Sequence, residues 1–459
     1  MITKKNTKNL FYGFLTLHLL IWVFVPTFSN QNLPLDTIEA LAWGSNLDWG
    51  FQKHPPLSAL FVEMFYQIFS NQDWAYYLLS QIFVVTAFYV VWKFCEDFFK
   101  NRIYSLISIL LLEGIIFYNF TTPEFNVNVC LLTFWSLSIY YCWQSFKNDK
   151  IRNWILFGFF SGLGFLSKYL FVYLLAGIEI FFIYHIIKIK KFNFKHFISV
   201  VIFFIVISPH LLWLEKNNYV TLTYALNRTG LENSDILNHL IYPFIFLGKQ
   251  IGILIPFFLM SFFLIKKFKI KVNLKDNKVL FLLSVNLLPI IFIFLTSLIF
   301  GVKIRTMWMT PFYLFLGVLI IYVFSSNIDF KKIKKFYISF LVFLIISPAI
   351  YLYISTTQTN KRTDYPGKEI AYLVQNKWDN NFSNEISIVI GDEWYGGNLS
   401  YNLRSRPKWF KSLDINSYVE KEKIEGGVIY VGSPNILKKI CPGVYGTIKP
   451  IGICMIGSK

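Results

Sequence analysis

Charged residues are scarce in this sequence. Only 26 of its 459 residues are acidic, and charged residues of both signs make up 15% of the chain. A typical soluble domain carries about a quarter of its residues as Asp, Glu, Lys and Arg. Hydrophobic residues account for 55% of the chain, and 50 of them are phenylalanine. This composition argues against a soluble fold and favours a membrane protein.

Cysteine motifs are also missing. The five cysteines, at 95, 130, 142, 441 and 454, include no C-x-x-C pair. The sequence therefore has neither zinc-site spacing nor a dense disulfide framework. Cys441 and Cys454 can pair if they lie in an oxidising compartment, and two unpaired thiols are the alternative.

The net charge of +18 does not indicate nucleic acid. The lysines gather between apolar segments, a pattern typical of loops on the cytoplasmic side of a membrane. We therefore expect membrane lipid around the chain and no nucleic-acid partner.

Long apolar stretches recur along the chain, and about 18 or more apolar residues suffice for a helix to cross a bilayer. We predict an all-α polytopic bundle of about eleven transmembrane helices. The spans are expected near 10–28, 74–94, 103–120, 125–145, 154–167, 169–187, 197–214, 240–265, 279–300, 307–325 and 335–355. The first is expected to remain as an uncleaved span, and Lys168 is expected at the bend between the fifth and sixth. Glu113 and Glu179 fall within spans, where acids are costly, and have no assigned role.

The distribution of positive charge predicts the orientation. With the N-terminus inside, the inner segments hold 23 lysines and arginines, whereas the outer loops before residue 356 hold seven. Those seven are Lys53, Lys168, Lys216, Arg228, Lys249, Lys303 and Arg305. Cytoplasmic loops are the ones enriched in basic residues, so we predict a cytoplasmic N-terminus.

The tail differs from the rest of the chain. We divide the sequence into a transmembrane domain, 1–355, and a soluble domain, 356–459. The tail is polar and mixed, with strand-like runs at Ile386–Ile390 and Val428–Val431 and glycine turns expected at Gly396–Gly397 and Gly426–Gly427. About 100 residues suffice for a small α/β domain, expected in the periplasm of an inner-membrane protein.

The loop 29–73 is too polar to span a membrane, and it carries two acids three residues apart. Asp36 and Glu39 share a face if they lie on a helix, and Pro34 stands where a helix can begin. Paired carboxylates near a basic residue suit acid–base chemistry on a charged substrate. The alternative is that these acids only complement the dipole of a helix N-terminus.

The same loop carries a family resemblance. It reads Asp36-Thr-Ile-Glu39-Ala and later Trp49-Gly-Phe-Gln-Lys53-His54-Pro55-Pro56-Leu57. This string resembles the first outer loop of glycosyltransferase family 39, which includes the protein O-mannosyltransferases and the lipid A aminoarabinose transferases.

Three later stretches resemble the same family, and the resemblance covers roughly residues 10–325. They are Thr121-Thr-Pro123-Glu124, with Glu where the family has Asp, then Gly162-Leu-Gly-Phe-Leu-Ser167-Lys168-Tyr169, then Ser208-Pro209-His210-Leu-Leu-Trp213.

The resemblance implies a GT-C membrane fold and a polyprenyl-phosphate sugar as donor, with the sugar facing outward. It implies an inverting transfer in which Asp36 is the catalytic carboxylate, assisted by Glu39. Donor phosphate is then expected at Lys53, His54, Lys168 and Arg305, and acceptor or sugar at Glu124 and Arg228. The alternative for these cations is contact with lipid headgroups.

No cofactor is required by this interpretation, although a divalent metal is possible. Its candidate ligands are Glu39, His54 and His210, because imidazole and carboxylate suit zinc-like ions. The alternative is that each histidine bonds phosphate or a backbone carbonyl.

Two other classes of function compete with the glycosyltransferase. A transporter or flippase of lipid-linked sugar would share many spans, but transporters often contain paired repeats, and the loop 36–57 has no second copy. A scaffold would not need acids and cations in separate outer loops. The sugar and the acceptor, whether lipid A, another glycan or a protein, stay open.

Overall fold

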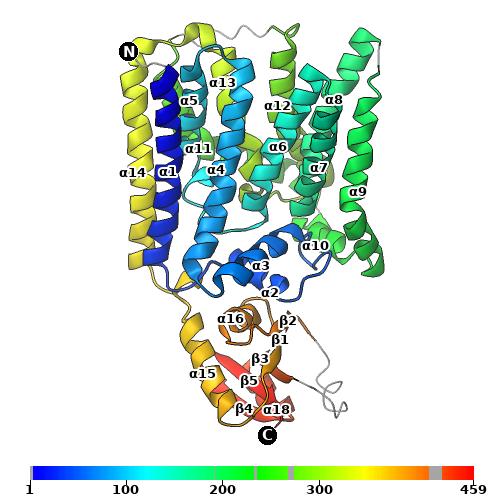
Figure 1. The fold of residues 1–459 in the computed structure, drawn as a ribbon, viewed down its shortest axis with the longest axis vertical. Coiled ribbons are helices and arrows are strands. Elements are labelled where there is room, and N and C mark those ends of the chain that lie inside the picture. Colours follow the sequence, from blue (N-terminus) through cyan, green and yellow to red (C-terminus); the bar gives the residue numbers. More distant parts are fainter. Residues whose placement is uncertain (1–3, 191, 232–234, 267–272, 413–425, 459) are drawn as a thin grey trace.

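The computed structural model describes residues 4–190, 192–231, 235–266, 273–412 and 426–458. Long helices stand side by side as a bundle, and a smaller mixed unit covers one end of it (Figure 1). The N-terminus lies at the end of the bundle away from this unit. Four of the lysines counted for the orientation, Lys191, Lys267, Lys269 and Lys271, lie outside the described residues.

Seven helices of the described part are long and apolar enough to cross a membrane. They are α1 (Lys4–Ser29), α4 (Asp73–Phe98), α8 (Val172–Ile189), α9 (Lys195–Lys216), α11 (Asn238–Phe262), α12 (Asn277–Phe300) and α14 (Ile333–Thr357). The pair η5 (Thr306–Tyr313) and α13 (Leu316–Val323), bent by 52°, makes an eighth if it is counted as one broken span. All eight lie where spans were predicted.

The other three predicted spans differ from a simple apolar helix. The prediction of one span over 103–120 is wrong, because this stretch divides into α5 (Arg102–Leu110), η1 (Leu111–Gly114) and η2 (Ile116–Tyr118). Gly114 lies so close to α11 that a Cβ there would be 2.7 Å from the backbone of Phe257. The helices α6 (Val127–Asn148) and α7 (Ile151–Ser167) do form, but neither meets the length and hydropathy of a span. The predicted eleven spans are therefore not confirmed.

Apolar side chains cover the outside of the bundle. Phe204 on α9, Phe244 on α11 and Ile345 on α14 are each more than half exposed. Large apolar surfaces of this kind are expected where a protein contacts lipid. The chain is therefore a multi-pass membrane protein.

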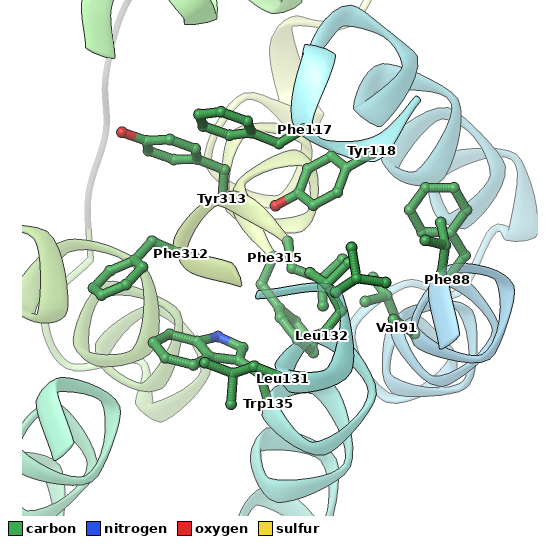
Figure 2. Close-up of a cluster of buried hydrophobic side chains, with 14 of the residues drawn as sticks. Phe88, Val91, Phe117, Tyr118, Leu131, Leu132, Trp135, Phe312, Tyr313 and Phe315 are labelled. Atoms are coloured by element: carbon green, nitrogen blue, oxygen red, sulfur yellow. The ribbon is translucent and has the colours of Figure 1, made fainter. Parts of the chain in front are cut away.

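An aromatic core ties the broken segment 111–126 to η5 (Figure 2). The ring of Phe312 lies 4.9 Å from that of Trp135 on α6, and the hydroxyl of Tyr118 donates to the carbonyl of Thr310 over 2.8 Å. Aromatic pairs at this spacing stabilise beyond the area they bury. The packing fixes the two stretches that carry Glu124 and Trp308.

The loop 29–73 folds into two short helices, α2 (Leu35–Gly44) and α3 (Leu57–Phe69). They lie at the end of the bundle that faces the C-terminal unit (Figure 1). As predicted, α2 begins directly after Pro34, whose φ of −61° suits a helix start. The ten residues of α2 are therefore placed between the bundle and the C-terminal unit.

The C-terminal unit is a five-stranded sheet of order β2-β1-β3-β5-β4. Its strands are β1 (Ile386–Ile390), β2 (Lys408–Phe410), β3 (Gly427–Gly432), β4 (Val444–Ile448) and β5 (Ile451–Ile456), with helices α15 (Gly367–Asp379), α16 (Tyr395–Asn402) and α18 (Pro434–Ile440). The strand β1 pairs in parallel with both β2 and β3, while β5 runs antiparallel to β3 and β4. Short connecting helices complete the described elements: η3 (Tyr169–Phe171), α10 (Val220–Thr229), η6 (Ser325–Asn327), η7 (Phe330–Lys332) and η8 (Arg362–Asp364).

Both predicted strand runs are present, and Cys441 and Cys454 form a disulfide. The turn predicted at Gly396–Gly397 is wrong, because these residues lie within α16. A Cβ on Gly397 would lie 3.0 Å from the side chain of Ile38. The glycine therefore allows α16 to approach α2.

Candidate functional site

A cavity of about 480 Å³ lies where α2, the loop after it, α8, α10, α12 and η5 converge. Seven of the residues singled out from the sequence line it: Asp36, Glu39, Lys53, His54, Lys168, Arg228 and Arg305. These residues come from four separate segments of the chain. The cavity therefore combines two carboxylates, four cations and an imidazole.

The position of Asp36 is set by the segment that contains Glu124. The backbone N–H of Asp36 donates to Glu124 Oε1 over 2.9 Å, and the hydroxyl of Thr37 donates to the carbonyl of Phe125 over 3.1 Å. An acid at this place accepts one of the free N–H groups of a helix start. Glu124 thus holds the first turn of α2 against the bundle, although it does not line the cavity itself.

The two acids have different electrostatic surroundings. Burial raises the pKa of Asp36, while the charges of Lys168, Lys53, Arg228 and Arg305 act to lower it. Burial, followed by the charge of Asp36, raises the pKa of Glu124 to about 8. Because Asp36 faces the cations, we expect it to carry the negative charge at neutral pH while Glu124 keeps its proton.

Lys168 lies at the break between α7 and α8, as predicted for the bend. Its ammonium donates to Asn128 Oδ1 over 2.5 Å and lies 5.2 Å from the ring centroid of Trp308. Burial lowers the pKa of Lys168 to about 7, against the influence of Asp36. An anion entering the cavity would favour its charged form.

Lys53 differs from the other cations because carboxylates hold it. Its ammonium lies 2.8 Å from Glu39 Oε1 and 3.4 Å from an oxygen of Glu393 in the C-terminal unit. Burial lowers the pKa of Lys53, but the hydrogen bond and charge of Glu39 and the charge of Glu393 outweigh it, and the pKa is raised. In the described part of the chain, Lys168, Arg228 and Arg305 have no such ion pair.

The proposed metal ligands do not form a metal site. His210 is engaged at both nitrogens, with the carbonyl of Trp49 2.6 Å from Nδ1 and the hydroxyl of Tyr169 2.7 Å from Nε2. The carboxylate of Glu39 is engaged by the Lys53 ammonium. Among the described residues no cluster of three His, Cys, Asp or Glu side chains is placed to hold an ion. The backbone-carbonyl alternative holds for His210.

The loop motif and the Ser208–Trp213 motif pack together. The indole of Trp213 donates to Asp48 Oδ2 over 2.6 Å. A Cβ on Gly50 would lie 2.4 Å from the ring of Trp213. The glycine at this position is thus required for the loop to close onto α9, next to the Trp49–His210 contact.

Several cavity residues were not predicted from the sequence. Asn128 and Tyr224 line the cavity, and neither stood out from a sequence pattern. Trp308 also lines the cavity, and its ring centroid lies 5.2 Å from the Lys168 ammonium. Glu393 lies outside the cavity, next to Lys53, in the tail, which carries no family motif.

Part of the chain resembles a known protein family. Residues 53–213 match the family model described as "Dolichyl-phosphate-mannose-protein mannosyltransferase". This segment contains Lys53, His54, Glu124, Lys168 and His210, but not Asp36. No curated protein matches the whole sequence significantly.

The fold resembles that of ArnT from Cupriavidus metallidurans. The crystal structure of ArnT bound to undecaprenyl phosphate superposes with a TM-score of 0.64 over 99% of this chain and 98% of ArnT, at 12% sequence identity. The apo structure of ArnT gives a TM-score of 0.60 over 97% and 98%, also at 12% identity. Residues 53–213 therefore resemble the protein mannosyltransferase family, and the fold of the chain resembles that of ArnT.

Proposed function

We propose that this chain transfers a sugar from a polyprenyl-phosphate donor to an acceptor at the outer membrane surface. The observation that carries the proposal is the cavity in which Asp36 faces Lys168, Arg228 and Arg305. A carboxylate base and a group of cations without carboxylate partners are what the transfer of a sugar from a phosphate requires. The occurrence of undecaprenyl phosphate in ArnT, which has the same fold, supports this choice of donor.

The cations suit the phosphate of the donor. Arginine presents a planar fork that can bind phosphate with two hydrogen bonds, and lysine presents a point charge. We assign Lys168, Arg228 and Arg305 to the phosphate, with Lys53 and His54 beside them. The imidazole of His54, neutral because burial lowers its pKa to about 3, can donate a hydrogen bond but adds no charge.

The apolar wall of the cavity suits the lipid. Val172 and Phe300 line the cavity, and each is about half exposed. A chain that leaves the cavity past them passes into the surrounding membrane. We propose that the polyprenyl tail takes this path while the phosphate stays at the cations.

The chemistry then follows from the positions of the acids. An acceptor oxygen attacks the anomeric carbon, the bond from this carbon to the phosphate oxygen breaks, and the phosphate leaves with the bonding electrons. Asp36 takes the proton of a hydroxyl acceptor, whereas an acceptor that is itself a phosphate is already ionised and needs only orientation. Lys168, Arg228 and Arg305 stabilise the charge that grows on the leaving phosphate, and Glu124 holds the Asp36 turn.

Sugar transfer in vesicles tests the proposal. Purified protein is reconstituted with a radiolabelled polyprenyl-phosphate sugar and extracted outer-envelope lipids and glycans, and product is separated from donor. Labelled product that disappears in an Asp36→Asn variant supports transfer. Accumulation of sugar inside sealed vesicles without product would instead support the transporter and overturn the proposal.

The orientation is part of the same proposal. The helix α2, whose Asp36 and Glu39 line the cavity, and the C-terminal unit lie at the end of the bundle opposite the N-terminus (Figure 1). We place this end outside the cytoplasm. A reporter that is active only in the periplasm, fused after Lys459, is expected to be active. A reporter active only in the cytoplasm would contradict this orientation if it functioned at the same position.

A further inference from the structure

The C-terminal unit places an acid beside Lys53. Glu393 is 8% exposed and approaches the Lys53 ammonium to 3.4 Å, while Glu39 approaches it to 2.8 Å from the bundle side. Lys53 is therefore held between one carboxylate from α2 and one from a different folded unit. Neither the family model over residues 53–213 nor the outer-loop motifs include Glu393.

The place of Glu393 in the sheet is informative. The chain leaves β1 at Ile390, and β1 lies between β2 and β3, its parallel neighbours on the two sides. The connections from such a strand diverge, and in open α/β sheets ligand sites form at the carboxyl ends of strands where this happens. The turn after β1 is directed at the membrane domain, and α16 begins there.

Local hydrogen bonds fix this turn. Asp392 Oδ1 accepts from the backbone N–H groups of Trp394 and Tyr395, each over 2.8 Å, as a helix N-cap does. Trp394 is itself buried, in the same apolar cluster as Ile38 of α2. Glu393 is thereby held between a capped turn and a buried indole.

The docking of the whole unit is equally well defined. Arg406 donates to the carbonyl of Leu41 and to Glu63 Oε2, each over 2.7 Å, and its guanidinium lies 4.2 Å from the ring centroid of Tyr66. The hydroxyl of Tyr401, which belongs to α16, donates to Asp73 Oδ1 at the start of α4 over 2.8 Å. These contacts set the distance between Glu393 and Lys53.

We propose that Glu393 is a positioning residue that, together with Glu39, holds the Lys53 ammonium at the cavity wall, so that the docked C-terminal unit completes the donor site. This inference rests on the proposed function, because it takes sugar transfer as the reaction in which Lys53 takes part. Glu393 does not line the cavity, and its effect on transfer passes through Lys53.

The test compares Glu393→Gln with Glu385→Gln in the full-length protein. Glu385 is an exposed acid of the same unit, so it serves as the matched control for the loss of one negative charge. Glu393→Gln is expected to lower kcat/KM for the polyprenyl-phosphate sugar by about fivefold to tenfold, the scale of a partly screened charge–charge contact. The loss should appear mainly in KM, and the control should retain wild-type values.

A double-mutant cycle separates positioning from general stability. In a Lys53→Met background, Glu393→Gln should cause no further loss, because its effect requires the ammonium. An equal loss in both backgrounds would show that Glu393 only stabilises the docked unit and would overturn the proposal.

A labelling experiment tests the contact between Glu393 and Lys53 without measuring sugar transfer. Acylation of Lys53 by an amine-reactive reagent, followed by mass spectrometry, should be several-fold faster in Glu393→Gln than in Glu385→Gln, because the amine loses a carboxylate that favours its charged form. Unchanged labelling would overturn the contact. Absence of transfer by the wild-type protein would overturn the proposed function, whereas the labelling result would still decide the Glu393–Lys53 contact.

Discussion

Two acid clusters in this protein differ in how their carboxylates are enclosed. Inside the bundle, His18 Nδ1 of α1 and Glu113 Oε1 of η1 lie 2.6 Å apart, with both side chains fully buried. The side-chain amide of Asn119 donates to Glu113 Oε2 over 3.3 Å. At the end of the bundle that faces the C-terminal unit, Asp36 instead faces an open cavity with several cations around it.

The difference indicates which charged groups a substrate can reach. An acid in a closed contact contributes to the fold, and a new ligand cannot reach it without breaking that contact. The cavity keeps cations that have no carboxylate ion pair among the described residues, with Lys168 buried, Arg305 partly exposed and Arg228 exposed. An anion that joins them would favour the charged form of the buried Lys168. The four predictions below test this distinction, from the largest expected effect to the smallest.

Asp36→Asn should have the largest effect on transfer. The amide keeps the size of the side chain but cannot take a proton, so turnover should fall by about a hundredfold or more, the range of general-base contributions. Donor binding should persist, because the phosphate is assigned to the cations. Single-turnover transfer measures the chemical step, and binding of labelled polyprenyl phosphate measures the donor step. Wild-type turnover at wild-type expression would show that Asp36 only begins the helix and is not the base.

Lys168→Met should come next. It removes a buried cation but keeps a long unbranched side chain, so donor affinity should fall by about tenfold to a hundredfold, since a hydrogen bond to a charged group contributes about 1.5–3 kcal/mol. Lys216→Met is the matched control, because Lys216 is an exposed lysine that lies outside the cavity. Equal affinity in both variants would remove Lys168 from the phosphate site.

Glu113→Gln should affect stability and leave the chemistry intact. Loss of the contact between Glu113 and His18 should lower the free energy of unfolding by about 1–2 kcal/mol, the scale of polar contacts between membrane helices. Transfer per folded molecule should stay close to wild type. Thermal unfolding in detergent measures the stability, and activity normalised to folded protein measures the transfer. A loss of turnover without a loss of stability would contradict the proposed difference between Glu113 and Asp36.

Glu124→Gln should have the smallest effect on the rate at neutral pH. Glutamine resembles the protonated acid and can still accept from the N–H of Asp36, so transfer should change by less than about threefold.

The same variant has a signature in its pH dependence. Because the pKa of Glu124 is raised from 4.5 to about 8, the folded protein holds a proton that the unfolded chain releases. The contribution of this bound proton to the free energy of unfolding is present in full below about pH 4.5. It declines as the pH rises between the two pKa values and is lost above about pH 8. Thermal midpoints between pH 5 and 9 should therefore fall less steeply in Glu124→Gln than in the wild type, and equal slopes would contradict the assigned proton.

The sequence predicted the cavity better than it predicted the bundle. Asp36, Lys53 and Lys168 were found because short motifs preserve the spacing of groups that must meet. The segment 103–120 was misread because its apolar composition resembles a span, whereas Gly114 and the packing against α11 break the helix. An apolar composition indicates that a segment is buried away from water. It does not show whether lipid or the protein interior surrounds the segment.

The tail shows a second limit. Gly396 and Gly397 predicted a turn because glycine often occurs in turns, but here Gly397 allows two helices to approach closely. Glu393 has no local pattern that marks it, because its partner Lys53 is 340 residues away along the chain. Contacts between separately folded units depend on docking geometry, which no window of sequence contains.

The position of α2 also affects the cooperativity of the molecule. A helix of ten residues is too short to persist by itself in water, so its structure depends on the bundle on one side and on α16 on the other. Opening of the C-terminal unit and fraying of α2 should then occur as one local unfolding event. A ligand bound at Asp36 would oppose that event by mass action, so amide hydrogens of α16 should exchange more slowly when the cavity, on the other side of α2, is occupied.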